Sequence, residues 1–353
     1  MVALGADYFR ALETPRMARL APNVFAAAFP LMKLMPARYI LDRACADGVL
    51  TAGTRIVETT SGTFGMALAL LAAARGYPLT LVTAASLIDA TYARRLQMLG
   101  VSLVVSPDEQ GNGDQRARLD EVNRIRRYEP GSFWPRQYDN PENAIAYARL
   151  AELLVRTVSK IDYLVGCVGS GGSLCGTGTF LRAMFPDLAI IAVDTHRSVL
   201  FGQPAGKRLL RGLGNSVLPA NLQHDLVDEV HWIGAYPAFR EASRLLRQHG
   251  IFQGPTSAAA ALAARWVARS HPDARVALIM ADEGYRYVDT VFNDAWLAKL
   301  PGWSSPTLPE PILLSAIEPA SEAEWTRFAW ERRSLAEVVG AHSDNQEPAP
   351  GRS

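Results

Sequence analysis

The sequence is short of several features that define specialised classes of protein. It has three cysteines (Cys45, Cys167 and Cys175), too few for a disulfide framework, and no spacing of cysteine or histidine fits a metal site. No uninterrupted apolar run reaches the length of a membrane span. A net charge of +1 without a basic stripe argues against nucleic acid as a partner. The first residues lack the basic and apolar regions of a signal peptide, so we expect a cytoplasmic protein.

Lysine is also scarce, which narrows the search for a reactive amine. Only four of the 36 basic residues are lysines, namely Lys33, Lys160, Lys207 and Lys299. Lys33 is flanked by apolar residues on both sides and lies just before Pro36, which is expected in the first turn of a helix. Lowering a lysine pKa by about three units costs about 4 kcal/mol, so a buried amine here would indicate function. The alternative is a lysine whose ammonium group reaches water.

The pattern of strands and helices predicts the fold class. The length of 353 residues favours two domains, and 49% hydrophobic with 20% charged residues is typical of a globular protein. Short β-branched runs alternate with helical patterns as far as about residue 300. This alternation predicts an α/β fold whose parallel sheets carry helices on both faces. Beyond Pro301 the composition changes, and we expect one helix over 322–339 and disorder over 343–353.

A glycine-rich turn between a strand and a helix is the most distinctive local motif. The apolar run Tyr163–Val168 predicts a buried strand. The turn that follows consists of Gly169, Ser170, Gly171, Gly172 and Ser173. Free N–H groups at the helix start, together with the serine hydroxyls, favour a single phosphate group. The dinucleotide pattern fails because Leu174 stands where its last glycine is required, and the nucleotide-triphosphate pattern lacks its lysine. A tight packing turn is the alternative.

Two further stretches carry polar side chains at predicted turns. Arg55–Glu58 predicts a strand, and Thr59–Gly65 then opens a helix. A helix start rich in hydroxyl groups suits a carboxylate, although an ordinary capped helix explains it equally well. The stretch Gln137–Asn143 lies in a loop before the next predicted helix. Because ligands of such folds bind where strands end and helices begin, we expect these turns to open into one crevice.

Taken together, these stretches resemble the cysteine synthase family, the fold type II pyridoxal-phosphate enzymes with a tryptophan synthase β-like fold. The stretches that match the family's landmarks, in the family's order, are Glu58–Gly65, Gln137–Asn143, Gly169–Ser173, Gly250–Ser257 and Asp282–Tyr287. Residues 192–202, 211–214 and 287–296 are most similar to one branch of the family. That branch makes N-(2-amino-2-carboxyethyl)-L-glutamate on the way to the siderophore precursor 2,3-diaminopropionate.

The resemblance implies an architecture of two doubly wound, mostly parallel sheets. It assigns residues 1–35 and 140–300 to a large cofactor-binding domain. Residues 36–139 would form a smaller, mobile substrate domain, and 301–353 a partly disordered C-terminal extension. A homodimer that acts on small amino acids is implied as well.

The resemblance also implies roles for single residues. Lys33 would bind pyridoxal 5′-phosphate as a Schiff base, and Gly169–Ser173 would hold its phosphate. Thr63 would face the 3′ oxygen of the cofactor. Glu283 would face its pyridine nitrogen, where the family usually has a serine. The residues expected to bind the substrate are Thr60, Ser61, Gly62, Gln137 and Ser198.

The implied reaction is a β-replacement on an O-activated serine, such as O-phosphoserine or O-acetylserine, by an amine or a thiol. Lys33 would take the α-proton as general base. The chain departs from the family around the cofactor: the Asn-Pro-Gly-Gly-Ser before the lysine is missing, and Leu34-Met35, Thr63 and Glu283 replace the usual residues. Two alternatives therefore remain open. One is β-elimination or racemisation of a small amino acid, and the other is a non-catalytic relative with a binding or regulatory role.

Overall fold

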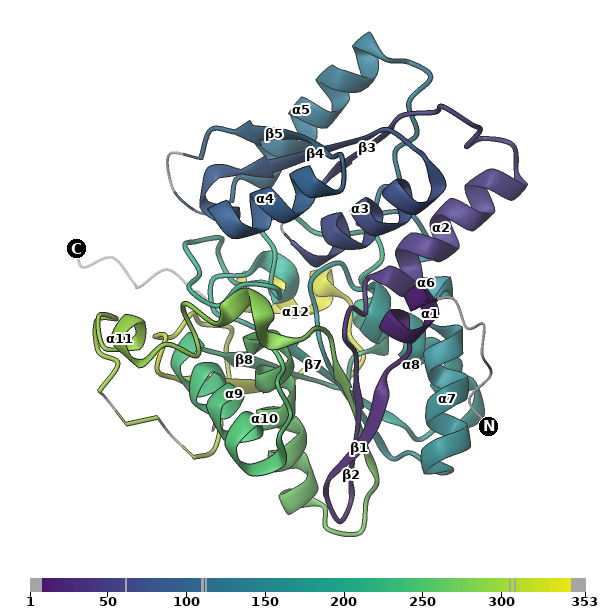
Figure 1. The fold of residues 1–353 in the computed structure, drawn as a ribbon. Coiled ribbons are helices and arrows are strands. Elements are labelled where there is room, and N and C mark those ends of the chain that lie inside the picture. Colours follow the sequence, from purple (N-terminus) through teal and green to yellow (C-terminus); the bar gives the residue numbers. More distant parts are fainter. Residues whose placement is uncertain are drawn as a thin grey trace, which may run out of the picture.

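The computed structural model describes residues 8–60, 62–108, 111, 113–304, 306–307 and 309–343. This part of the chain contains two β-sheets with helices packed against them, arranged as an upper and a lower unit in Figure 1. The predicted α/β class with mostly parallel sheets is confirmed. None of the described helices is both long and apolar enough to cross a membrane.

The larger sheet has eight strands in the order β1-β2-β9-β6-β7-β8-β11-β10. Its central strands from β2 to β8 run parallel, whereas β1 pairs antiparallel with β2 and β11 pairs antiparallel with β8. The strands are β1 (Arg16–Ala21), β2 (Val24–Ala28), β6 (Tyr163–Cys167), β7 (Ala189–Asp194), β8 (Glu229–Ile233), β9 (Val276–Met280), β10 (Ile312–Leu313) and β11 (Trp325–Ala329).

Strand β9 shows why both faces of this sheet carry helices. All five of its residues are buried, and alternate side chains point to opposite faces. Ala277 and Ile279 pack into one apolar layer with α7 and α8, and the other three residues pack with α9 and α10. The helices around this sheet are α6 (Glu142–Ile145), α7 (Ala148–Val158), α8 (Gly172–Met184), α9 (Ala235–His249), α10 (Pro255–Ser270), α11 (Asp294–Leu297) and the 3₁₀ turns η2 (Val199–Phe201), η3 (His224–Leu226) and η4 (Gly284–Tyr287). Helix α1 (Tyr8–Glu13) packs against the smaller unit instead.

The smaller sheet consists of three parallel strands in the order β3-β4-β5. They are β3 (Ile56–Thr59), β4 (Leu79–Ala84) and β5 (Ser102–Ser106). The elements around them are α2 (Leu34–Ala46), α3 (Thr63–Arg75), η1 (Ala85–Leu87), α4 (Ala90–Met98) and α5 (Gln115–Tyr128). Helices α2, α3 and α4 share one apolar layer with this sheet, and Val122 of α5 packs in another. The carboxyl ends of both sheets thus supply turns to the space between the two units.

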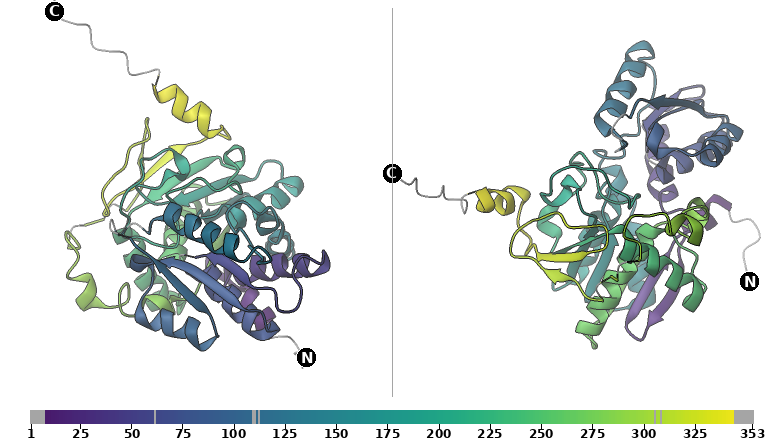
Figure 2. Two further views of the ribbon diagram at one scale, coloured as in Figure 1. Left: turned by 90° about the horizontal axis from the view of Figure 1, so that it is seen from above. Right: turned by 90° about the vertical axis from the view of Figure 1, so that its left-hand side faces the viewer.

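The C-terminal extension differs from the expectation. Residues 322–339 do not form one helix, because Trp325–Ala329 is strand β11 and α12 covers Leu335–Ser343. β11 pairs with β8, and Nε1 of Trp325 donates to Nδ1 of buried His231 at 3.0 Å. Pairing with an available sheet edge therefore overrides the helical pattern of the sequence. Helix α12 projects from the body of the molecule (Figure 2). Most of the stretch expected to be disordered, residues 344–353, lies outside the described residues.

Candidate active site

One cleft between the two units brings together most of the residues singled out in the sequence. Its lining includes Lys33, Thr60, Gly62, Thr63, Gln137, Gly169, Ser170 and Ser173. These residues follow the carboxyl ends of β2, β3 and β6 or lie in the loop before α6. Parallel strands end at the same edge of their sheet, which is why segments far apart in the sequence meet here. Ser61 was also expected at this site, but it lies outside the described residues.

Lys33 presents its amine to the glycine-rich turn. Its Nζ donates a hydrogen bond to Oγ of Ser170 at 3.1 Å. The residue as a whole is half-buried, but the amine lies deep enough that burial lowers the pKa of Lys33 to about 8. The turn that carries it is fixed to the large sheet, because the N–H of Met32 donates to the carbonyl of Ala281 just beyond β9 at 2.9 Å. Near neutral pH a part of the Lys33 population therefore has a neutral, nucleophilic amine.

The turn of residues 169–173 forms a cup at the start of α8. Gly169, Ser170 and Ser173 line the cleft. Gly171 has a φ of +83°, and a Cβ there would lie 2.6 Å from the carbonyl oxygen of Asn221. A Cβ on Gly172 would lie 2.5 Å from Oδ1 of Asn143. These two glycines thus admit neighbouring protein segments, whereas the other three residues of the turn line the cleft.

Thr60 shapes the turn that opens α3. Its Oγ1 accepts hydrogen bonds from the N–H groups of Gly62 and Gly65, both at 3.0 Å. This arrangement caps the start of the helix and fixes Thr63, the first residue of α3, at the cleft. The carbonyl of Gly62 accepts a hydrogen bond from the hydroxyl of Tyr92 at 2.5 Å, which ties the turn to α4. Thr60 and Gly62 are therefore tied to α3 and α4 without a ligand.

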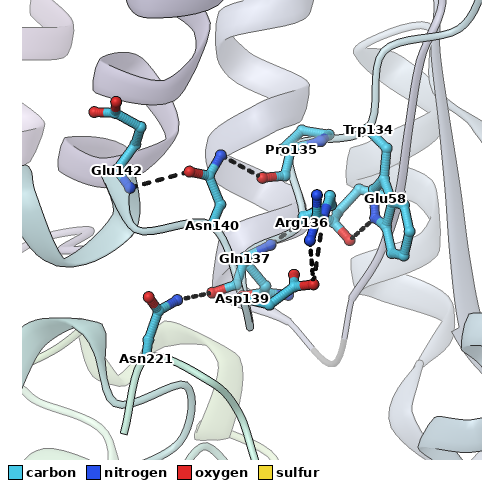
Figure 3. A network of polar contacts seen from close by, with 9 residues as sticks. All are labelled: Glu58, Trp134, Pro135, Arg136, Gln137, Asp139, Asn140, Glu142 and Asn221. Carbon is cyan, nitrogen blue, oxygen red and sulfur yellow. Dashed lines mark hydrogen bonds and ion pairs between the residues drawn. The ribbon is translucent and has the colours of Figure 1, made fainter. Parts of the chain in front are cut away.

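Gln137 is buried and joined to three other segments. Its Nε2 donates to the carbonyl of Thr59 at 3.0 Å, and its N–H donates to Oε2 of Glu58 at 3.2 Å. Its carbonyl accepts from Nδ2 of Asn143 at 2.5 Å and from Nδ2 of Asn221 at 3.2 Å. Figure 3 shows the loop around Gln137 between Glu58 on one side and Asn221 on the other. The loop that carries Gln137 is thus fixed to both units.

Two residues predicted for the site lie elsewhere. Ser198 is fully buried, and its Oγ accepts a hydrogen bond from the N–H of Asn215 at 3.0 Å. Asn215 lines the cleft, and Ser198 contacts it without being a lining residue itself. Glu283 does not appear among the described lining residues, whereas its neighbour Asp282 does, as does Thr256 at the start of α10. A shift of one position along an extended segment turns the side chain to the opposite side.

Several charged residues of the cleft were not identified from the sequence. Five cationic side chains line it among the described residues, and one acidic side chain faces them; these are Lys33, Arg118, Arg208, Arg211, Arg286 and Asp282. Oδ1 of Asp282 is buried without a hydrogen-bond partner among the described residues, and burial raises the pKa of Asp282 to about 6. Arginine is abundant along the whole chain, so no pattern marks these four. The excess of positive charge suits an anionic ligand.

Comparisons with known proteins agree with this geometry. Residues 32–282 match the family model described as pyridoxal-phosphate dependent enzyme. The N-(2-amino-2-carboxyethyl)-L-glutamate synthase of Cupriavidus metallidurans is 35% identical over 277 residues, which cover 76% of this chain and 81% of that protein. A solved O-ureido-L-serine synthase has a TM-score of 0.74 and 28% identity, with 84% of this chain and 100% of that chain covered. A cysteine synthase from Entamoeba histolytica has a TM-score of 0.74 and 25% identity, with 81% and 89% covered.

The expected resemblance to the cysteine synthase family is thereby confirmed, and with it the fold type II architecture. The matched region begins one residue before Lys33 and ends at Asp282, so it contains the lining residues of the cleft named above except Arg286. The chain belongs to the family of pyridoxal-phosphate dependent enzymes.

Proposed function

We propose that this protein catalyses a β-replacement on an O-activated L-serine, with an amine as the incoming nucleophile. The observation that carries the proposal is the pairing of the buried Lys33 amine with Ser170 of the glycine-rich cup at 3.1 Å. A reactive amine beside an anion-binding helix start is the arrangement that an aldehyde with a phosphate group requires.

The residues present fit pyridoxal phosphate. Gly169, Ser170 and Ser173 would hold its phosphate at the start of α8, and Lys33 would bind its aldehyde carbon. Oδ1 of Asp282, which is buried without a partner among the described residues, can accept a hydrogen bond from a donor in the cleft, and Glu283 is not among the described lining residues. When bound, the cofactor supplies an electron sink for negative charge at the α-carbon of an amino acid.

Lys33 performs the proton transfers in this proposal. Its pKa of about 8 leaves it partly neutral near pH 7, so it can accept the α-proton of the amino acid as a general base. The leaving group then departs from the β-carbon with its electron pair. The incoming amine forms the new bond there and gives up a proton, and Lys33 returns a proton to the α-carbon. General base catalysis of this kind contributes about 10²–10⁴ in rate.

The turn of residues 60–62 and Gln137 would bind the carboxylate of the substrate. Thr60 and Gln137 are both fixed by hydrogen bonds to neighbouring segments, so they are organised in advance of binding. We further propose that residues 36–139 act as the smaller, mobile unit that closes over the substrate. Closure excludes water, which strengthens the otherwise modest interactions of a carboxylate with a helix start.

The charges of the cleft favour O-phosphoserine as the activated serine. Arg118 is buried, and its neighbour Gln115 has a buried Nε2 without a partner among the described residues. Both side chains line the cleft, where they can donate to a phosphate group. Because the Cupriavidus relative is named for a glutamate product, we propose L-glutamate as the amine nucleophile.

The test is to mix purified, cofactor-loaded protein with O-phosphoserine or O-acetylserine, with and without L-glutamate or sulfide. We expect the absorbance of the bound cofactor to change with the activated serine alone and to recover when the nucleophile is added. The product should contain the amine joined to the β-carbon. Release of an α-keto acid and ammonia would instead identify an eliminase. Cofactor absorbance that is the same in Lys33→Ala and in the wild type would support a non-catalytic relative.

A homodimer in the cytoplasm completes the proposal, and it is supported by the family membership. Light scattering coupled to size-exclusion chromatography measures the oligomeric state directly.

A further inference from the structure

A buried carboxylate lies next to the substrate-binding turn without taking part in the chemistry described so far. Glu58 is the third residue of strand β3, between the apolar residues 56–57 and the turn that begins at Thr59. It is fully buried, although an acidic side chain is almost never found in the interior unless it is paired. Among the described residues, no ion pair neutralises it. Its charge is balanced by hydrogen bonds alone.

Three donors converge on the two oxygens of Glu58. Oε1 accepts from the N–H of Thr59 at 2.8 Å and from Nε1 of Trp134 at 3.0 Å. Oε2 accepts from the N–H of Gln137 at 3.2 Å. In Figure 3 the carboxylate of Glu58 lies beside the Trp134 indole, next to the segment that runs from Trp134 to Gln137. One side chain therefore connects the end of β3 with the loop that carries Gln137.

The connection continues from Gln137 to the reactive amine. Nδ2 of buried Asn143 donates both to the carbonyl of Gln137 at 2.5 Å and to Oγ of Ser170 at 3.2 Å. Ser170 in turn accepts from Nζ of Lys33 at 3.1 Å. The position of Gln137 is thus determined from both sides, by Glu58 in the small unit and by Asn143 next to the cup.

We propose that Glu58 is a positioning residue that sets the affinity for the amino acid substrate. It does so by fixing the position of the turn at Thr60 relative to the loop that carries Gln137. The inference rests on the proposed function, because it takes these two segments to bind the substrate carboxylate. Glu58 does not touch the ligand in this account. It acts through the backbone N–H groups of Thr59 and Gln137.

Protonation of Glu58 weakens this arrangement. Burial raises the pKa of Glu58 to about 7, and the three hydrogen bonds to its charged form oppose that rise. The negative charge of Asp139, which is paired with Arg136, makes the smallest contribution to this value of about 7, and it acts in the same direction as burial. The other charged groups near this network are Arg118, which donates to Oγ1 of Thr59, and Arg126, which lies over the ring of Trp134. When Glu58 is protonated, one of its oxygens carries a hydrogen, so the side chain can no longer accept all three of these hydrogen bonds.

The experiment compares wild type, Glu58→Gln and Asp139→Asn as cofactor-loaded proteins. The probe is O-phosphoserine, and its dissociation constant is measured from the absorbance of the bound cofactor between pH 6 and 8.5. Because Glu58→Gln keeps the shape but loses one acceptor of a charge-assisted hydrogen bond, we expect a dissociation constant about tenfold higher at pH 8. We expect kcat to change by less than about twofold, since Lys33 is untouched.

Two further results follow if Glu58 is the titrating group. The ratio of the dissociation constants of Glu58→Gln and wild type, in which the titration of O-phosphoserine itself cancels, falls from about tenfold toward one as the pH falls through about 7. In Asp139→Asn the affinity at pH 8 equals that of the wild type, and the midpoint moves to lower pH because one source of negative charge is gone.

The outcomes separate this inference from the proposed function. Equal affinities of wild type and Glu58→Gln for O-phosphoserine, or a loss of kcat at unchanged affinity, would overturn the role of Glu58 and leave the proposed function intact. Equal affinities of wild type and Asp139→Asn near pH 7 would do the same, and this comparison does not depend on whether Glu58→Gln folds. A wild type that binds neither O-phosphoserine nor O-acetylserine would instead refute the proposed function.

Discussion

The reactive lysine should destabilise the protein that contains it, and Lys33→Met measures by how much. Burial lowers the pKa of Lys33 from 10.5 to about 8. Each pKa unit corresponds to about 1.4 kcal/mol, so retaining the ammonium in the fold costs about 3 kcal/mol. The substitution also removes the hydrogen bond to Ser170, worth about 1 kcal/mol. Ser170 keeps its contact with Asn143, so no buried hydroxyl loses all its partners. The expected net gain is about 2 kcal/mol at pH 7 for the cofactor-free protein.

The sign of the pH dependence follows from the two pKa values. The folded pKa of about 8 lies below the unfolded value of 10.5, so the unfolded chain binds more protons between them and stability rises with pH there. The cost is present in full below pH 8 and is gone above 10.5. The advantage of Lys33→Met over the wild type should therefore shrink steadily between pH 8 and 10.

The assay is urea unfolding of both cofactor-free proteins at pH 7, 8.5 and 10, followed by circular dichroism. Lys160→Met is the matched control, because Lys160 is exposed and forms a surface ion pair with Asp162. It should change the free energy of unfolding by less than about 1 kcal/mol. A Lys33→Met protein that is no more stable than the wild type at pH 7 would refute the predicted cost of burying the Lys33 ammonium. An advantage that is the same at all three pH values would refute it too.

Three further substitutions test other parts of the structure. In Gly171→Ala the new Cβ would lie 2.6 Å from the carbonyl oxygen of Asn221, at a φ of +83°. Titration with pyridoxal phosphate should therefore show weaker binding than in the wild type. Gly131→Ala is the control and should bind like the wild type, because its Cβ would have no atom within 4 Å. Arg118→Met should raise KM for O-phosphoserine far more than for O-acetylserine, and an equal rise for both would contradict a phosphate contact. Trp330→Ala removes a fully buried ring that packs on Phe201, so thermal unfolding should show a loss of about 3–5 kcal/mol while the absorbance of the bound cofactor stays as in the wild type.

The parts of the site that are contiguous in the chain could be predicted from the sequence. The turn of residues 169–173 and the turn of residues 60–62 each follow an apolar run and precede a helical pattern. Lys33 could be singled out because lysine is rare and its neighbours are apolar. These local signals need no knowledge of which strands are adjacent, and the structure places the described residues of all three segments around one cleft.

Features that depend on distant contacts could not be predicted. Glu58 is recognisable as an acidic residue in an apolar strand, but two of its donors lie 76 and 79 positions later in the chain. Residue 172 must be a glycine because the side chain of Asn143 occupies the space of a Cβ there. Residues 325–329 form strand β11 because they pair with the edge of β8. The difference between Asp282 and Glu283 is one step along an extended segment, which reverses the direction of a side chain.

The pairing of β11 with β8 bears on how the protein should be handled. A chain shortened at about residue 310 would expose those backbone N–H and C=O groups of β8 that now pair with β11, and copies of the protein could add strand to strand along this edge and precipitate. Affinity tags belong after α12, which already points away from the body. Removing the residues after about 310 to help crystals form would therefore promote precipitation instead.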